Sequence, residues 1–204
     1  MTPQVTRGRF LSLSGAGLAA AAGLGALAPA VLAAAPASDL GALSSGDLAY
    51  ARLLICYELL EIDFFTNAIR SRHLRGTALR EARAALANER EHYAYLAGAI
   101  TDAGATPLSA ADVDFSYPRT TFYGGREVKR FALGLEQLTL ASYLGAGGAI
   151  ADGALAAALA QIAANEAQHG CAFALIAGHA LLDEAFPPSV TIEEASNALG
   201  AYTS

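Results

Sequence analysis

The chain has 204 residues, of which 54% are hydrophobic and only 16% are charged, and its formal net charge is −6. This length fits one domain with a substantial core, and the absence of a basic cluster argues against a nucleic-acid partner. The two cysteines are too few for a disulfide scaffold or for an iron centre held by four thiolates. Abundant alanine, with few β-branched residues, predicts an all-α fold.

Residues 1–37 have the pattern of an export signal rather than of a folded element. A short basic region with Arg7 and Arg9 precedes a weakly hydrophobic stretch, and the final Ala-Pro-Ala has the small-x-small form of a cleavage site. We therefore expect cleavage near Ala37 and a periplasmic or other extracytoplasmic location. Loss of the two arginines takes the net charge from −6 to −8.

The export route is left open by the sequence. Residues 6–11, Thr-Arg-Gly-Arg-Phe-Leu, resemble the twin-arginine (Tat) export motif, but Gly8 stands in place of the second arginine. General secretion is an alternative. A retained membrane anchor is another, although Pro29 and the many Ala and Gly residues would make a poor membrane helix. After cleavage we expect no stable membrane span.

Beyond a linker at 38–46, the sequence predicts four long helices. The first runs from about Asp47, as N-cap, to His73, and the second from about Thr77 to Asp102. The third covers about 126–149 and the fourth about 153–182, where a Phe-Pro-Pro sequence follows. The short connection within each pair predicts two antiparallel hairpins.

Residues 103–124 interrupt this pattern with glycines, prolines and four aromatic residues. Such a segment is the expected long crossover between two hairpins, returning along the bundle with its aromatics packed against the outside. Residues 183–204 form a tail, in which Thr191 and Glu194 predict the capping box of a short helix. The whole pattern predicts a four-helix bundle at 47–182.

The tripeptide Ala-Asn-Glu occurs twice, and each copy is followed by a histidine after two further residues. The copies place Glu89 before His92 and Glu166 before His169. An i,i+3 spacing sets both side chains of a pair on one helix face, where a carboxylate and an imidazole can share a metal ion. The repeat distance, 77 residues from Glu89 to Glu166, indicates two helix pairs of similar plan.

A further acid precedes each pair: Glu58 lies 31 residues before Glu89, and Glu136 lies 30 residues before Glu166. Both acids interrupt apolar helical runs, and a buried carboxylate is costly unless it is paired or binds a cation. Four carboxylates and two neutral imidazoles balance two divalent ions, and they suit Fe or Mn better than a structural Zn site. We expect two Fe or two Mn ions per chain, held by Glu58, Glu89, His92, Glu136, Glu166 and His169.

This combination of two Glu-x-x-His pairs and two partner acids resembles the ferritin-like superfamily of dinuclear carboxylate proteins, over about residues 45–182. The resemblance implies that one glutamate of each pair bridges the ions, and that each histidine holds one ion with the upstream acid of its hairpin. The second complete pair is more similar to bacterioferritin, rubrerythrin and manganese catalase than to animal ferritin. The leader and single bundle most resemble exported ferritin-like proteins related to plant desiccation-induced proteins.

Several nearby residues are candidates for supporting roles. Phe65 and Tyr143 stand seven residues after the two upstream acids, and we expect them to line the access side. Tyr143 is also a candidate catalytic residue, as a hydrogen-bond donor to a ligand or a redox tyrosine; the alternative is a core aromatic. Glu61 could reach the site but is expected to be exposed or to face its own hairpin. Asn88 and Asn165 are candidates for hydrogen bonds across the bundle.

The cysteines and the remaining histidines are expected to lie outside the site. Cys56 and Cys171 each stand two residues from a predicted ligand, about 200° around the helix, so both should point away. We expect buried, free thiols, with a disulfide as the alternative. His73 and His179 lack partners at metal-binding spacing and are expected on the surface or at helix ends.

These features predict an exported protein whose di-iron or di-manganese centre acts on O2 or peroxide. The candidate reactions are ferrous oxidation, peroxide reduction and peroxide disproportionation. A peroxidase would need an external electron donor, because no rubredoxin-type cysteines follow the bundle. One alternative is a non-catalytic stress or desiccation-related bundle with a structural or vestigial metal site. Another is iron storage in an oligomeric shell, and a homodimer is also open.

Overall fold

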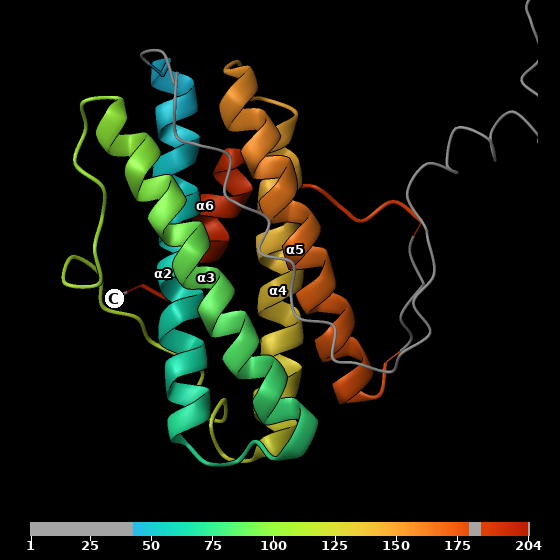
Figure 1. Cartoon of the computed structure of the whole chain (residues 1–204). Coiled ribbons are helices and arrows are strands. Elements are labelled where there is room, and N and C mark those ends of the chain that lie inside the picture. The colour runs from blue at the N-terminus through green and yellow to red at the C-terminus, as the bar shows by residue number, and fades with distance from the viewer. Residues whose placement is uncertain (1–42, 180–184, 204) are drawn as a thin grey trace, which may run out of the picture. The chain divides into compact units, whose positions relative to one another are not determined.

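The computed structural model describes residues 43–179 and 185–203, and in these residues every named element is an α-helix (Figure 1). Four long helices and a short fifth confirm the predicted all-α architecture. They are α2 (Ser45–Arg70), α3 (Gly76–Asp102), α4 (Gly125–Gly147), α5 (Gly153–Ala177) and α6 (Ile192–Gly200). No helix in the described ranges is long and apolar enough to cross a membrane. The predicted export signal at 1–37 lies outside the described residues.

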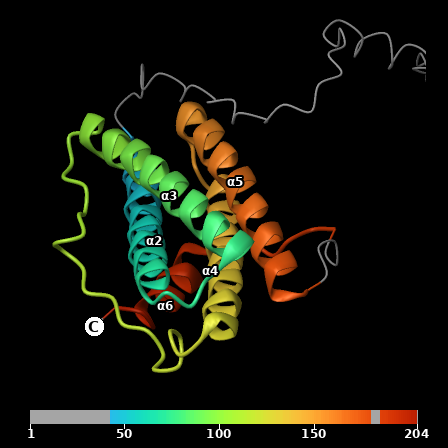
Figure 2. The ribbon, with the colours of Figure 1, turned by 60° about the horizontal axis from the view of Figure 1, so that its bottom comes forward.

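The four long helices form two hairpins, α2 with α3 and α4 with α5, and the hairpins pack with α2 beside α4 and α3 beside α5. Residues 103–124 run along the outside of the bundle, from the end of α3 to the start of α4 at the opposite end (Figures 1 and 2). Because this crossover returns along the whole bundle, α3 and α4 run in the same direction. The predicted topology of two hairpins joined by a long crossover is confirmed.

The core of the bundle consists of two apolar clusters, one toward each end. One cluster is built around Phe64, Phe65 and Phe173, and the other around Leu54 and Leu155. Along α3, α4 and α5 a glutamate or histidine separates the buried residues of one cluster from those of the other, and on α2 Glu58 directly follows that boundary. The middle of the bundle is therefore a polar layer enclosed by apolar layers.

Helix α2 begins earlier than the sequence predicts. Its N-cap is Ser44, whose hydroxyl accepts a hydrogen bond from the backbone N–H of Asp47 at 3.0 Å. The carboxylate of Asp47 is 3% exposed and accepts hydrogen bonds from the N–H groups of Ala151 (2.8 Å) and Asp152 (3.2 Å). The predicted cap is thus wrong, because Asp47 instead ties the start of α2 to the α4–α5 connection.

Other helix ends differ by a few residues from the predicted bounds. Helix α2 ends at Arg70, since Arg72 takes a positive φ of 59°. Helix α3 begins at Gly76 after Arg75, and no side chain caps it, so Thr77 is not its cap. Helix α5 ends at Ala177, and Gly178 follows it in the left-handed conformation of a C-cap (φ 82°). The predicted end of this helix, Leu182, lies outside the described residues.

The short α6 has the predicted capping box, in which Thr191 and Glu194 bond each other's backbone N–H groups. It packs against α2 and α4. The hydroxyl of Tyr57 donates to the carbonyl of Ala195 at 2.6 Å, so a buried residue of α2 fixes α6. The chain approaches α6 by crossing α4 closely: a Cβ on Gly145 would lie 1.8 Å from the carbonyl oxygen of Val190.

The crossover packs as predicted, with its aromatic residues on the bundle. Phe64 of α2 contacts Tyr117 and Phe122, with ring centroids 6.1 and 5.8 Å apart. The hydroxyl of Tyr117 donates to Asp63 at 2.8 Å. Tyr123 is the exception, since it is 59% exposed.

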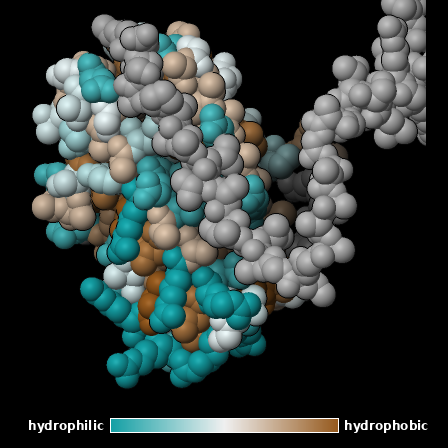
Figure 3. All heavy atoms as spheres, in the orientation of Figure 1, coloured by the Kyte–Doolittle hydropathy of each residue, from teal (hydrophilic) through white to brown (hydrophobic). Residues whose placement is uncertain are grey.

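Hydrophilic residues gather at the end of the bundle that carries the α2–α3 connection (Figure 3). Exposed basic residues at this end include Arg70, Arg72, Arg75, Arg80 and Arg83. Among the ion pairs of the described residues, none joins the polar layer in the middle to an arginine or lysine.

Candidate metal centre

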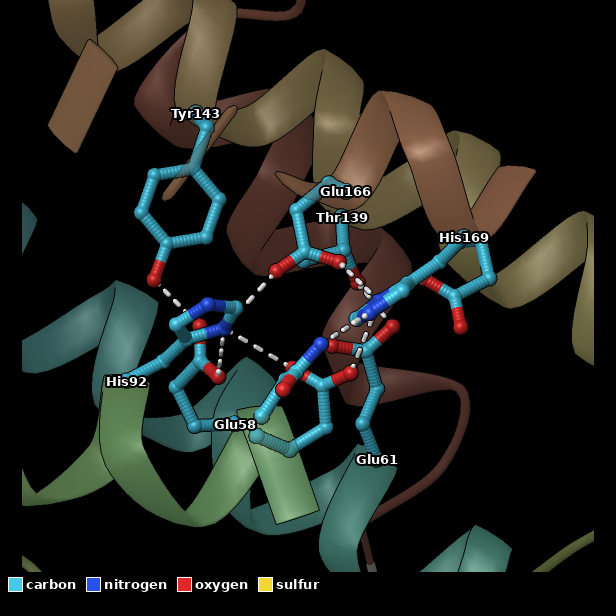
Figure 4. Close-up of polar contacts among 10 residues, drawn as sticks. Glu58, Glu61, His92, Thr139, Tyr143, Glu166 and His169 are labelled. Carbon is cyan, nitrogen blue, oxygen red and sulfur yellow. Dashed lines mark hydrogen bonds and ion pairs between the residues drawn. The ribbon is translucent and has the colours of Figure 1, made fainter. Parts of the chain in front are cut away.

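The polar layer contains all six residues predicted as metal ligands, contributed by all four long helices (Figure 4). The four glutamates are fully buried and the two histidines lie at the edge of the layer, with side chains 9–11% exposed. Helix α2 provides Glu58, α3 provides Glu89 and His92, α4 provides Glu136, and α5 provides Glu166 and His169.

One half of the cluster surrounds His92, and we call it the His92 half. Its Nδ1 atom lies 2.9 Å from Glu89 Oε2, 3.0 Å from Glu166 Oε1 and 3.4 Å from Glu58 Oε2. A single ring N–H can donate fully to only one of these oxygens. The ligand atoms lie within 4.8 Å of one another, close enough to meet on one cation.

The other half surrounds His169, and we call it the His169 half. Its Nδ1 atom lies 3.0 Å from Glu89 Oε1 and 3.4 Å from both Glu136 Oε2 and Glu166 Oε2. Glu89 and Glu166 thus direct one oxygen into each half, while Glu58 and Glu136 belong to one half each. This is the arrangement that two bridging carboxylates require.

The cluster leaves an unusual number of buried polar atoms without a hydrogen-bond partner. An unsatisfied buried polar atom costs about 1–3 kcal/mol, and more when it is charged. The unsatisfied site atoms among the described residues are Glu58 Oε2, Glu61 Oε2, Glu89 Oε1, both oxygens of Glu136, both oxygens of Glu166, and His169 Nδ1. Divalent cations between the two histidines would satisfy most of these atoms at once, so the residues fit a metal centre.

The family follows from this fold and from the sequence. A sequence model of the ferritin-like domain matches residues 46–179, which cover nearly all of α2 to α5. The chain belongs to the ferritin-like domain family. No curated protein matches the chain in sequence.

The electrostatics of this ferritin-like domain favour positive charge in the layer. Burial, followed by the neighbouring glutamates, raises the pKa of Glu58 to about 8 and raises the pKa of Glu136 well above its usual value. Burial alone would lower the pKa of His92, but its carboxylate partners raise it to about 12, and the pKa of His169 is raised likewise. Without cations, protons must therefore compensate the clustered carboxylates.

Hydroxyl and amide groups of neighbouring side chains make polar contacts with two of the predicted ligands. Tyr143 of α4 donates to Glu58 Oε1, so this residue has the predicted contact with a ligand carboxylate. Asn88 Nδ2 lies 3.0 Å from His169 Nε2, a contact from α3 to α5 that fixes the ring's outer nitrogen. Asn165 makes no such contact with a ligand in the described structure and instead lines a cleft between α3 and α5.

That cleft, of about 290 Å³, borders the cluster, because His169 forms part of its wall. The amides of Asn88, Asn165 and Gln168 also line it. Phe65 and Tyr143, which were expected to line the access side, are both 1% exposed, lie in the core clusters and do not line this cleft.

Sequence reasoning missed the role of Glu61, which was expected to be exposed or to face its own hairpin. The structure buries Glu61 completely and places it at the cluster, with Thr139 Oγ1 donating to its Oε1 at 2.9 Å. The signal was its i,i+3 spacing from Glu58, the same spacing that relates the two ligands of each Glu-x-x-His pair. Its hydrogen-bond partner, Thr139, lies on another helix, so local spacing alone does not reveal this contact.

The residues expected outside the site are indeed outside it. Cys56 is half-buried and Cys171 is exposed, so the expected burial of Cys171 is wrong. Both thiols are free, and the alternative of a disulfide between them is not realised. His73 and His179 are exposed, as predicted.

Proposed function

We propose that this chain is an exported ferritin-like protein whose bundle binds two Fe or two Mn ions and acts on O2 or peroxide. The observation that carries the proposal is the set of unsatisfied carboxylate oxygens that converge on two imidazole nitrogens in the middle of the bundle. Oxygen and imidazole ligands of this kind suit redox-active iron and manganese.

The ligands would divide between the two halves. Glu58 and His92 would hold one ion, Glu136 and His169 the other, while Glu89 and Glu166 would bridge them. When bound, the ions would supply the electrons that reduce the oxidant. The apolar clusters on both sides of the layer exclude bulk water, and this strengthens every charge interaction inside.

Other residues would control access and protons. The cleft between α3 and α5 admits a solute of the size of O2 or hydrogen peroxide to the His169 side. Burial and the adjacent Glu58 raise the pKa of Tyr143 well above its usual value, so its hydroxyl keeps its proton and orients Glu58. An external donor would return electrons if the reaction is a peroxidase reaction.

The location is part of the proposal. Residues 1–37 would direct export and be removed near Ala37, and the protein would act in an extracytoplasmic compartment, alone or as a homodimer, in oxidative or desiccation stress. N-terminal sequencing of protein isolated from that compartment would test the cleavage. A chain that retains Arg7 and Arg9 in the cytoplasm would contradict it.

Metal analysis of the mature protein from its native host tests the function, with optical spectra in air and after peroxide. We expect about two Fe or Mn ions per chain and a spectrum that changes on peroxide addition. The His92→Ala, His169→Ala double variant is the control and should lose both properties while keeping its helicity. If no metal binds after anaerobic reconstitution with ferrous or manganous ion, the bundle is purely structural. Gel filtration separates a monomer or dimer from a storage shell.

A further inference from the structure

The two hairpins share one plan, so the positions where they differ are informative. Three residues after Glu58 on α2 stands Glu61, and three residues after Glu136 on α4 stands Thr139. Both Glu61 and Thr139 are 0% exposed. Five buried carboxylates therefore share the polar layer, one more than a symmetric repeat would supply.

Glu61 lies on the His169 side of the layer, beside the four residues Glu89, Glu136, Glu166 and His169 whose ligand atoms lie within 4.8 Å of one another, and it is not itself one of those four. Thr139 donates to its Oε1 at 2.9 Å, which leaves Oε2 buried and without a hydrogen-bond partner. Its side chain is directed toward His169, and not toward the Tyr143 and His92 side (Figure 4). After burial, Glu136 is the strongest influence that raises the pKa of Glu61, ahead of Glu58 on its own helix.

In the His92 half, by contrast, a ligand carboxylate already has a hydrogen-bond donor. The hydroxyl of Tyr143 occupies Glu58 Oε1, whereas both oxygens of Glu136 lack a hydrogen-bond partner. The counterpart of Tyr143 in the first hairpin is Phe65, which has no hydroxyl and stacks on Phe173 with ring centroids 5.4 Å apart. One half thus has a carboxylate oxygen engaged by a phenol, and the other has an additional carboxylate.

We infer that Glu61 is a further carboxylate ligand of the His169 half, and that this half therefore binds a divalent cation more tightly than the His92 half and fills first. The inference rests on the proposed metal centre. An added anionic oxygen strengthens the binding of a hard divalent cation such as Mn²⁺ or Fe²⁺. The ion beside Tyr143 is then the weakly held one, and a singly loaded protein carries its ion on the His169 side.

Titration of metal-free mature protein with Mn²⁺ tests the inference, with free Mn²⁺ followed by electron paramagnetic resonance. Wild type should bind two ions in steps whose dissociation constants differ by about tenfold or more. In Glu61→Gln the tighter step should weaken by about tenfold or more, with two ions still bound at saturation. The matched control is Glu91→Gln, an exposed acid of α3 that removes the same charge and should leave both steps unchanged.

Single-histidine variants assign the effect to one half. In a His92→Ala background the remaining site contains Glu61, so adding Glu61→Gln should weaken it by about tenfold or more. In a His169→Ala background the same change should alter the dissociation constant by less than about threefold. The reverse pattern would overturn the placement of Glu61.

A second readout separates ligation from a merely structural role. Glu61→Gln removes a buried acid, so the metal-free variant should melt at a higher temperature than wild type, while its Mn²⁺-induced rise in Tm should be smaller. If wild type binds two Mn²⁺ ions and Glu61→Gln binds them equally tightly, the inference fails and the metal centre stands. If wild type binds no Mn²⁺, the proposed centre and the inference fail together.

Discussion

At the scale of single residues, a few side chains fix the glutamates and histidines of the polar layer through polar contacts. Asn88, Thr139 and Tyr143 each direct one polar group at a glutamate or histidine of the cluster. These contacts join different helices; the Asn88 and Tyr143 contacts were candidates from the sequence, and the Thr139 contact was not. The sequence identified the six predicted ligands because their spacing repeats, but a supporting residue such as Thr139 has no spacing signal of its own.

The hydroxyl of Tyr143 should contribute measurably to stability. Tyr143→Phe leaves Glu58 Oε1 buried without its donor, so we expect a loss of about 1–3 kcal/mol in the unfolding free energy of the metal-free protein. Tyr93→Phe is the control, because its hydroxyl donates to the carbonyl of Leu108 away from the cluster and its loss should cost about 1 kcal/mol. Urea unfolding measures both; equal losses would argue against a special role for Tyr143.

Stability of the metal-free protein should depend on pH in a defined direction. The folded-state pKa of Glu58, about 8 against 4.5, adds stability that is present below pH 4.5 and lost as the pH rises through 8. The pKa of His92, about 12 against 6.5, acts in the same direction at higher pH. Hydrogen bonds from the two histidines overcome burial and lower the pKa of Glu166 from 4.5 to about 2, which adds stability that is lost as the pH falls from 4.5 to 2.

We therefore expect the metal-free protein to be most stable near pH 5 and to lose more than about 2 kcal/mol between pH 5 and pH 8. Urea unfolding at a series of pH values measures this. Glu58→Gln should flatten the loss, since the amide does not titrate. Bound metal should reverse the trend, because cations replace the protons as the pH rises. A metal-free protein that gains stability toward pH 8 would contradict the assignment.

At the scale of elements, helices were more predictable than their ends. Periodicity and the repeat predicted all four long helices, and the capping box predicted α6. The N-cap of α2 was mistaken because Ser44 and Asp47 are both good capping residues, and the choice depends on the α4–α5 connection that Asp47 bonds. The close crossing of the tail over α4 at Gly145 had no signal, since glycine is also common elsewhere in that helix.

Gly145 should be the glycine of α4 that tolerates a side chain least. A methyl group there would overlap the carbonyl of Val190, so Gly145→Ala should displace the tail and cost about 1–3 kcal/mol. Gly134→Ala is the matched control in the same helix: no atom lies within 4 Å of the added carbon, and stability should rise by about 0.5–1 kcal/mol.

Hydrogen exchange locates the change. In Gly145→Ala the amides of α6 should exchange faster than in wild type, because the tail that positions this helix has moved. The N–H of Val190, which donates to the carbonyl of Ala141 at 3.1 Å, should lose protection first. Unchanged protection of α6 would show that α4 can shift to accommodate the methyl group.

At the scale of the molecule, the two apolar clusters enclose a layer of five buried carboxylates. A metal ion bound in that layer would link all four long helices. A ligand that binds only the folded state adds about 2.7 kcal/mol at a hundredfold excess over its dissociation constant. Removal of metal by a chelator should therefore lower Tm by several degrees. The His92→Ala, His169→Ala variant should show no change, and a wild type insensitive to chelation would contradict a stabilising metal.

The crossover at 103–124 has a consequence for the symmetry of the centre. Two separate copies of one helical hairpin can associate about a twofold axis, but identical copies must then carry identical half-sites. Covalent linkage through the crossover removes that restriction, because a substitution in one hairpin is no longer copied into the other. Glu61 opposite Thr139, and Phe65 opposite Tyr143, are differences that two identical hairpins could not have.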